Sequence, residues 1–283
     1  MRNSTTNITR REAIKLCAGV GAGLLLLGTR CLHAGIPPSG QRAADLFSKT
    51  IPSSGEQIPV IGIGTARRYN VGTSAEERAP LREVLQHFVD LGGKMIDTAP
   101  SYGTAETVVG DLVADLGIRD QVFYATKVGA GGQGREAGIA EIEQSFRRLR
   151  TDHIELIQVH NLAGVNEMLP VLRDLKESGR IKYLGVTTTS PNQYEQLEQI
   201  MRNEPLDFIE VDYAIDNREV EARILPLAQD EGIAVLAALP FGRGRVFEAF
   251  GDQPIPQWAA EIGIESWAQF ALKYVVSGHR PVA

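Results

Sequence analysis

The sequence predicts an α/β fold of the (β/α)8 TIM-barrel type, incomplete at the C-terminus because the eighth βα unit is missing. Apolar runs of strand length alternate with longer stretches of helical period, which favours a parallel sheet. Six successive strands end at intervals of 30, 33, 27, 26 and 27 residues. These ends are Asp97, Lys127, His160, Thr187, Tyr213 and Pro240. Such regular spacing favours a closed barrel over an open sheet.

The expected elements follow in chain order. Runs rich in β-branched and aromatic residues predict strands at 58–66, 94–99, 122–128, 154–161, 181–189, 207–214 and 234–241. Stretches of helical period predict helices at 80–92, 106–117, 139–150, 167–179, 220–232 and 266–278. Several of these helices close on a glycine, where a left-handed cap is expected.

The N-terminal segment has the composition of an export signal. Basic residues, including the pair Arg10-Arg11, precede an apolar, glycine-rich run from Leu16 to Gly28. The arginine pair resembles the twin-arginine signal of bacterial proteins exported in folded form. The alternative is an accidental pair before a membrane anchor, and cleavage of the signal stays open. We expect a signal at 1–34, a linker at 35–56 and the barrel at 57–283. The location would be the periplasm or another exported site, with the export machinery as a partner.

Composition excludes several classes of function. Of 283 residues, 43% are hydrophobic and 23% charged, which is typical of a globular protein. Both cysteines, Cys17 and Cys31, lie in the signal, so the barrel has no thiol for nucleophilic or metal chemistry. Removing five basic residues and one acidic residue with the signal changes the formal charge from −6 to −10. We therefore expect neither nucleic acid nor a metal ion as a partner.

In a barrel, the carboxyl ends of all strands form one rim. Asp97, Lys127 and His160 would then face one another, with Tyr102 on the loop after the second predicted strand. A nearby ammonium favours the phenolate, so Lys127 would lower the pKa of Tyr102, and Asp97 would hold Lys127 in place. A neutral His160 would orient a substrate carbonyl. A proton donor without a nucleophile indicates hydride chemistry.

A glycine-rich run, GAGGQG at 129–134, has the spelling of a dinucleotide-binding fingerprint. It follows a strand and precedes a helix, as such a fingerprint requires. However, it lies in the third βα unit and its spelling can arise from glycine content alone. We interpret it as a rim loop, with a pyrophosphate cradle as the alternative.

Three segments carry a family resemblance. DTAPSYG with Glu106, YATKV, and RLRTDHIELIQVHN resemble signature regions of the aldo-keto reductase family, and the resemblance extends from about residue 56 to the C-terminus. It implies a (β/α)8 barrel that binds NADPH and reduces carbonyls to alcohols. It also implies that Tyr102 is the general acid, that Lys127 and Asp97 tune its pKa, and that His160 orients the carbonyl.

The resemblance also implies cofactor contacts, with departures from the family pattern. Tyr213 would stack on the nicotinamide ring. Thr187 and Thr188 stand where the family has a Ser-Asn pair that holds the carboxamide, and Glu210 takes the position of a Gln. A threonine hydroxyl replaces part of these contacts, but a carboxylate accepts hydrogen bonds and does not donate them.

A second cofactor segment, LPFGRGRVF, resembles the family loop that wraps the pyrophosphate. Phe241, Gly242 and Gly244 would form it, with Arg245 or Arg243 pairing with phosphate. The alternative is a solvated basic loop. HRPVA at 279–283 would open the eighth strand, and the family segment that binds the adenosine 2′-phosphate is absent. The resemblance implies NADP as the cofactor, and NAD stays open because the segment that decides between them is absent.

We expect an NADP(H)-dependent oxidoreductase that reduces an aldehyde, ketone or sugar carbonyl by hydride transfer, with Tyr102 as acid. The alternative is a non-catalytic nicotinamide-nucleotide-binding or regulatory barrel of the same family. A third hypothesis is a barrel lyase or isomerase that forms a Schiff base on Lys127.

Overall fold

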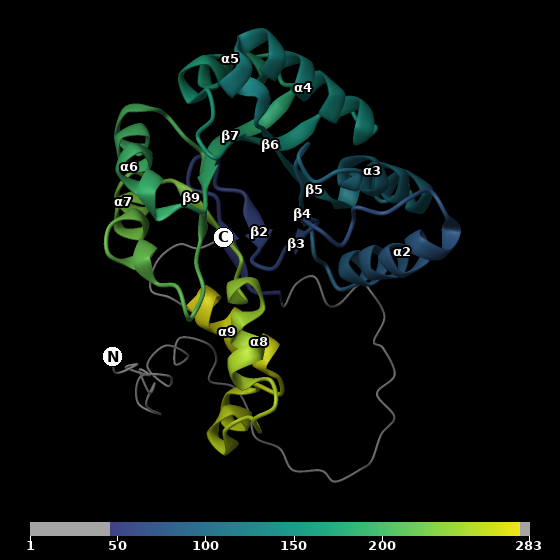
Figure 1. Cartoon of the computed structure of the whole chain (residues 1–283), viewed down its shortest axis with the longest axis vertical. Coiled ribbons are helices and arrows are strands. Elements are labelled where there is room, and N and C mark those ends of the chain that lie inside the picture. The colour runs from purple at the N-terminus through teal and green to yellow at the C-terminus, as the bar shows by residue number, and fades with distance from the viewer. Residues whose placement is uncertain (1–45, 278–283) are drawn as a thin grey trace.

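Seven parallel strands form a curled sheet in the order in which they follow one another along the chain (Figure 1). The computed structural model describes residues 46–277. The strands are β3 (Ile63–Gly64), β4 (Met95–Asp97), β5 (Phe123–Val128), β6 (Ile154–His160), β7 (Ile181–Thr188), β8 (Phe208–Asp212) and β9 (Ala234–Ala238). The arrangement confirms the predicted incomplete barrel. The residues expected to open an eighth strand, 279–283, lie outside the described part of the chain.

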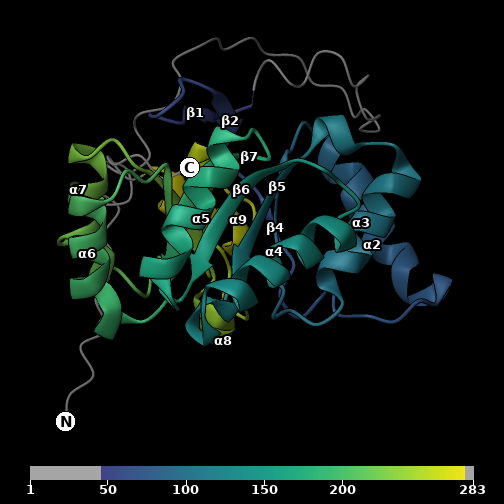
Figure 2. The same ribbon diagram turned by 90° about the horizontal axis from the view of Figure 1, so that it is seen from above.

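Helices cover the outer face of this sheet (Figures 1 and 2). They are α2 (Ala75–Asp90), α3 (Ala105–Leu116), α4 (Arg135–Arg148), α5 (Val165–Glu177), α6 (Tyr194–Asn203) and α7 (Ile224–Asp230). The last two helices, α8 (Arg245–Phe250) and α9 (Trp267–Ser277), lie below β9 in Figure 1, at the open side of the curl. Short 3-10 turns are η1 (Arg119–Gln121), η2 (Ala130–Gln133), η3 (Pro191–Gln193), η4 (Glu219–Glu221), η5 (Gly242–Gly244) and η6 (Gln257–Ile262). Within residues 46–277, every helix is too short or too polar to cross a membrane. The predicted signal lies outside this range.

The first predicted strand is divided into two. Residues 57–59 form β2 (Gln57–Pro59), which pairs antiparallel with β1 (Ser48–Thr50), and only Ile63–Gly64 joins the parallel sheet. Pro59 has no N–H to donate to a ladder, so the apolar run does not continue as one strand. The single strand predicted at 58–66 is therefore wrong in extent, and part of the predicted linker is structured as β1.

The start of α2 also differs from the prediction. The helix begins at Ala75, and the hydroxyl of Ser74 accepts the backbone N–H of Glu77, which caps its first turn. Pro80 lies inside this helix rather than at its start. The sequence analysis predicted a helix at 80–92, so its expected start is five residues too late.

Side chains alternate between two cores, because successive residues of a strand point to opposite faces. Toward the helices, the sheet contributes Tyr124, Val128, Ile157, Val159, Leu184, Val186, Ile209, Val211 and Val235. Toward the inside of the curled sheet, it contributes Met95, Phe123, Ala125, Leu156, Tyr183, Phe208, Ala234 and Leu236. The inner apolar residues fill the amino-terminal half, so the next inward positions along each strand form the carboxyl-terminal mouth.

The hairpin of β1 and β2 lies across the amino-terminal end of the curled sheet (Figure 2). Ile51 and Ile58 are buried in the inner core. The hydroxyls of Ser54 and Tyr183 are 2.7 Å apart, and Tyr183 also donates to the carboxylate of Glu56. The hairpin thereby closes the end of the inner core away from the polar mouth.

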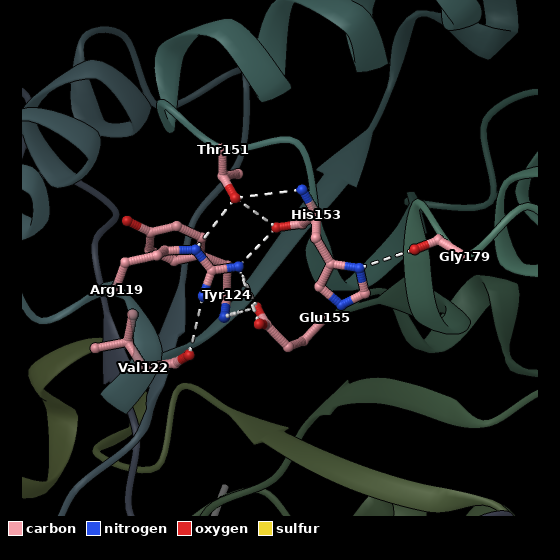
Figure 3. A network of polar contacts seen from close by, with 7 residues as sticks. All are labelled: Arg119, Val122, Tyr124, Thr151, His153, Glu155 and Gly179. Atoms are coloured by element: carbon pink, nitrogen blue, oxygen red, sulfur yellow. Dashed lines mark hydrogen bonds and ion pairs between the residues drawn. The ribbon is translucent and has the colours of Figure 1, made fainter.

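A network of polar contacts around Arg119 fixes the loops that lead into β5 and β6 (Figure 3). Arg119 donates to the backbone oxygen of His153 at 2.6 Å and to the carboxylate of Glu155 at 2.9 Å. Glu155 in turn accepts the backbone N–H of Tyr124 at 2.7 Å, and the Arg119 guanidinium lies 4.4 Å from the Tyr124 ring centroid. These contacts fix the start of β5 against the start of β6.

Candidate active site

Inward-facing polar residues meet at the carboxyl ends of β4 to β8. Strand register places Lys127 beside Gln158, and His160 beside Thr187. Thr187 in turn lies beside Glu210. Because the sheet is parallel, these positions form one level of the mouth. The structure thus brings together Asp97, Lys127 and His160 as the sequence predicted. It places Glu210, predicted as a cofactor contact, in the same cluster, and it adds Gln158.

Lys127 is the centre of this cluster and is 1% exposed. Its Nζ donates to Asp97 Oδ1 at 2.5 Å and to the backbone oxygen of Thr98 at 3.1 Å. A second carboxylate, that of Glu210, lies 3.2 Å from the same nitrogen. Burial alone favours the neutral amine, but the charges of Asp97 and Glu210 outweigh it and raise the pKa of Lys127. The lysine is therefore held as an ammonium.

Tyr102 stands on the loop between β4 and α3. Its backbone N–H donates to Ala99 at 3.0 Å in a tight turn, and Gly103 follows with φ +66°. A side chain at Gly103 would meet Asn70 at 2.2 Å, so the loop requires glycine there. The Tyr102 ring meets the His160 ring edge to face, with centroids 6.1 Å apart. Lys127 Nζ lies 5.6 Å from the centroid of the Tyr102 ring.

The pKa of Tyr102 moves in the opposite direction to the sequence prediction. Burial raises it, and although Lys127 lowers it, the carboxylates of Asp97 and Glu210 raise it further. The expected lowering rested on one ammonium paired with one carboxylate. The structure buries the phenol and places a second carboxylate near it, so the resting phenol is protonated.

His160 and Asp97 are both shifted toward their neutral forms. Burial and the charge of Lys127 lower the pKa of His160, although Glu210 and Glu141 oppose this shift. Burial and the charge of Glu210 raise the pKa of Asp97 to about 7, although Lys127 opposes this shift. The imidazole is thus neutral near pH 7, as the sequence analysis expected, and is suited to hydrogen-bond a carbonyl oxygen.

Sequence reasoning missed Gln158 and the role of Glu210 in this cluster. Gln158 donates from Nε2 to Glu210 Oε2 at 2.8 Å, and both side chains are buried. The signal that could have found them is alternation along the strand, because Gln158 lies two residues before His160. Glu106, part of the family signature, lies behind the site, where it accepts hydrogen bonds from Thr126 and Arg148.

Tyr213 is not part of the mouth, contrary to the sequence prediction of a stacking platform. Its ring is 3% exposed and belongs to the outer core, where it packs against Tyr274 of α9 with centroids 6.2 Å apart. Its hydroxyl donates to Glu221 at 2.8 Å. The reason is alternation along β8: Phe208 and Glu210 face inward, so residue 213 has the outward parity.

The two threonines at the end of β7 point to opposite faces for the same reason. Thr187 has the inward parity and lies between His160 and Glu210 in the register. Thr188 has the outward parity, and its hydroxyl donates to Gln193 and accepts the backbone N–H of Ser190. Of the two, only Thr187 is positioned at the mouth.

The loop after β9 is built around Asp216. Gly242 has φ +58°, and a side chain there would meet the Asp216 carboxylate at 2.4 Å. Arg245 donates from Nε to Asp216 at 2.6 Å, and its side chain is 51% exposed. Phe241 packs against Phe247 with centroids 5.1 Å apart, and Gly244 has φ +101°. The predicted phosphate loop is therefore a tight turn that carries an exposed arginine.

The N–H groups at the start of the glycine-rich run, residues 129–134, are bound by a side chain of the protein itself. Glu141 accepts the backbone N–H groups of Gly129 and Ala130 at 2.6 and 2.8 Å. Side chains at Gly131 and Gly138 would each meet Met168, at 2.4 and 2.2 Å. These glycines allow close packing and a carboxylate-capped turn, which supports the interpretation as a rim loop.

The mouth contains groups that fit the nucleotide implied by the family resemblance. The Oε1 atom of Gln158 is buried at the mouth without a hydrogen-bond partner in the described part of the chain. Buried polar atoms are normally satisfied, so this atom marks a place for a polar group of a ligand. Acceptors at Gln158 and Glu210 suit a carboxamide N–H, and Arg245 suits a phosphate.

Comparison with known proteins gives consistent matches. The sequence model of the aldo/keto reductase family matches residues 60–282. Aldo-keto reductase YhdN of Bacillus subtilis (strain 168) is 33% identical over 201 residues, 66% of this chain and 60% of that protein. Methylglyoxal reductase YeaE of Escherichia coli (strain K12) is 29% identical over 235 residues, 81% of each protein.

Solved structures match over a similar length. An aldo/keto reductase from Klebsiella pneumoniae, in complex with NADP and acetate, has a TM-score of 0.69 and 26% identity over 82% of each chain. The matches thus cover about four fifths of the Escherichia coli and Klebsiella pneumoniae reductases. This chain spans about three fifths of the Bacillus subtilis relative.

Proposed function

The chain belongs to the aldo/keto reductase family, and we propose that it is an NADP(H)-dependent oxidoreductase that reduces an aldehyde, ketone or sugar carbonyl to an alcohol. The observation that carries this proposal is the convergence of Tyr102, His160 and Lys127 at one mouth, with the Tyr102 and His160 rings edge to face at 6.1 Å. A phenol and a neutral imidazole in contact supply two hydrogen-bond donors to one carbonyl oxygen.

The residues of the site divide the work of such a reduction. NADPH, when bound, supplies the hydride. Neutral His160 would donate a hydrogen bond that orients the carbonyl, and Tyr102 would transfer its phenolic proton to the oxygen as negative charge develops there. Lys127 would stabilise the phenolate that remains, and Asp97 holds the ammonium in place at 2.5 Å. Gln158, Glu210, Thr187 and the Gly242–Gly244 turn with Arg245 would hold the nucleotide.

The geometry disfavours the Schiff-base alternative. A lysine nucleophile must be a free amine, which requires a lowered pKa. The carboxylates of Asp97 and Glu210 instead raise the pKa of Lys127, and two hydrogen bonds occupy its Nζ. Lys127 therefore suits electrostatic work rather than covalent catalysis.

The proposal is tested with the unmutated chain and Tyr102→Phe. NADPH and NADH are titrated against both proteins by tryptophan fluorescence, and consumption of NADPH is then followed with methylglyoxal and a simple aldehyde. We expect both proteins to bind NADPH and only the unmutated one to turn over. Equal turnover by Tyr102→Phe would refute the role of Tyr102. Binding without turnover by either protein, over a broad set of carbonyls, would favour the non-catalytic alternative.

We further propose that the protein is exported in folded form by the twin-arginine route, on the basis of the Arg10-Arg11 pair before an apolar run. A protein that binds its nucleotide in the cytoplasm would carry it across the membrane. The test compares the fractionation of the unmutated chain with that of a variant carrying Arg10→Lys and Arg11→Lys. Equal amounts of both in the periplasm would overturn the export proposal.

A further inference from the structure

Glu210 contributes a second negative charge to the ammonium at the centre of the site. Its carboxylate lies 3.2 Å from Lys127 Nζ and comes from β8, whereas Asp97 comes from β4. Its side chain is 9% exposed, and Gln158 donates to it at 2.8 Å. The contact is therefore built into the interior, and Gln158 fixes its position.

The number of donors on Lys127 limits what this ammonium can do. An ammonium has three N–H groups. Asp97 Oδ1 and the backbone oxygen of Thr98 take two of them, at 2.5 and 3.1 Å. One N–H is left for two neighbours, Glu210 and Tyr102. A carboxylate at 3.2 Å is the stronger acceptor, because it is charged.

The balance of charge points the same way. One ammonium lies between two carboxylates, so the cluster carries a net charge of −1 when both are ionised. A nearby negative charge disfavours formation of a phenolate. The cluster that the sequence predicted, Asp97 with Lys127, would be neutral and would leave the last N–H to the phenol.

We propose that Glu210 is a positioning residue that competes with Tyr102 for the last N–H of Lys127 and so keeps Tyr102 protonated over a wide range of pH. This inference rests on the proposed function, in which Tyr102 is the proton donor. A donor that stays protonated suits reduction of a carbonyl. The same tyrosine must be a phenolate to accept a proton during oxidation of an alcohol, so Glu210 moves that activity to more alkaline conditions.

The groups around Glu210 are consistent with this role. Lys127 from β5 and Gln158 from β6 contact it directly. Its charge contributes to the raised pKa of Asp97 on β4 and of Tyr102 on the following loop, and it opposes the lowering of the His160 pKa at the end of β6. Among these neighbours, Lys127 is the cation. Glu210 affects the Tyr102 phenol by accepting the Lys127 N–H that would otherwise be donated to the phenol oxygen.

The direct test is a spectroscopic titration of Tyr102. The full chain is labelled with carbon-13 at the tyrosine ζ position, and its seven tyrosines are titrated by NMR without substrate or nucleotide. The Tyr102→Phe spectrum assigns the signal. We expect Glu210→Gln to lower the titration midpoint of the Tyr102 phenol by about one pH unit, because the substitution removes a buried charge and keeps the shape of the side chain. Glu210→Met is the second variant, which removes the same charge if the amide does not fold.

Glu141→Gln is the matched control. Glu141 is another carboxylate near the mouth, it faces His160, and it is bonded to the rim loop rather than to Lys127. We expect its Tyr102 midpoint to equal that of the unmutated chain. An unchanged midpoint in both Glu210 variants, or an equal shift in Glu141→Gln, would overturn the proposal.

A kinetic test separates this inference from the proposed function. In Glu210→Gln, the alkaline limb of kcat for carbonyl reduction and the acid limb of kcat for alcohol oxidation should both move down by about one pH unit. Limbs that stay in place in an active enzyme would overturn the inference while leaving the function intact. A shifted NMR midpoint in a chain without turnover would support the competition for Lys127 and refute the reductase.

Discussion

The carboxylate of Glu141 accepts the backbone N–H of Gly129 at 2.6 Å. The same oxygen accepts the next N–H, that of Ala130, at 2.8 Å. Two successive N–H groups that converge on one carboxylate form a small anion-binding concavity. The protein fills this concavity with a side chain from α4, so it does not serve as a phosphate site.

We predict that Glu141→Ala lowers the free energy of unfolding by about 1 to 3 kcal/mol, because two backbone donors lose a charged acceptor. NADPH affinity should change less than twofold. Denaturant unfolding and a fluorescence titration measure the two quantities. Glu136→Ala, an exposed position in the first turn of the same helix, is the control and should change neither. A tenfold loss of NADPH affinity with unchanged stability would mean that the loop does hold phosphate.

A second prediction concerns Tyr213. Because its ring is packed against Tyr274 in the outer core, Tyr213→Leu should lower the free energy of unfolding by about 1 to 3 kcal/mol. NADPH affinity of the folded variant should stay within twofold of the unmutated chain. Tyr274→Leu is the matched control and should show the same pattern. If Tyr213→Leu alone weakened NADPH binding tenfold, a stacking role would be restored.

A third prediction follows from the lowered pKa of His160. Folding favours the neutral imidazole, so the unfolded chain binds a proton more readily. Stability linked to His160 is constant above the ordinary pKa of 6.5 and falls as pH drops below it. The slope cannot exceed about 1.4 kcal/mol per pH unit for one proton.

His160→Gln should therefore lose less stability than the unmutated chain between pH 7.5 and pH 5. Urea unfolding at several pH values measures the difference in stability between the two proteins. Because both proteins contain Asp97, its opposing contribution cancels in that difference. His87→Gln, exposed on α2, serves as the control. Parallel stability curves for the unmutated chain and His160→Gln would contradict the prediction.

A fourth prediction separates stability from chemistry. Arg119→Gln should lower the free energy of unfolding by about 2 to 4 kcal/mol, because Glu155 loses its charged partner in a half-buried network (Figure 3). The network lies at the amino ends of the strands, so NADPH affinity and turnover of the folded variant at low temperature should be retained. Arg82→Gln, exposed on α2, should be neutral. Loss of turnover at full stability would show that the network acts on the mouth directly.

The sequence predicted much of the fold because its signals are local. Alternating runs indicated a parallel sheet, and the spacing from Asp97 to Pro240 indicated a barrel, since each βα unit has a similar length. The division of the first strand at Pro59 was missed, because an apolar run does not show where its pairing partner changes. The same local reading placed Tyr213 at the mouth, although its parity along β8 places it outside.

For the site, the sequence by itself determined which side chains would meet. Asp97, Lys127 and His160 occupy strand ends, and strand ends of a parallel barrel share one rim. Only the tertiary structure decided their charge states, because these depend on distances between strands that are far apart in sequence. Glu210 lies 83 residues beyond Lys127, yet its carboxylate is 3.2 Å from the ammonium. Burial of the phenol raises the pKa of Tyr102, and the charge of Glu210 raises it further, so together they outweigh the lowering by Lys127.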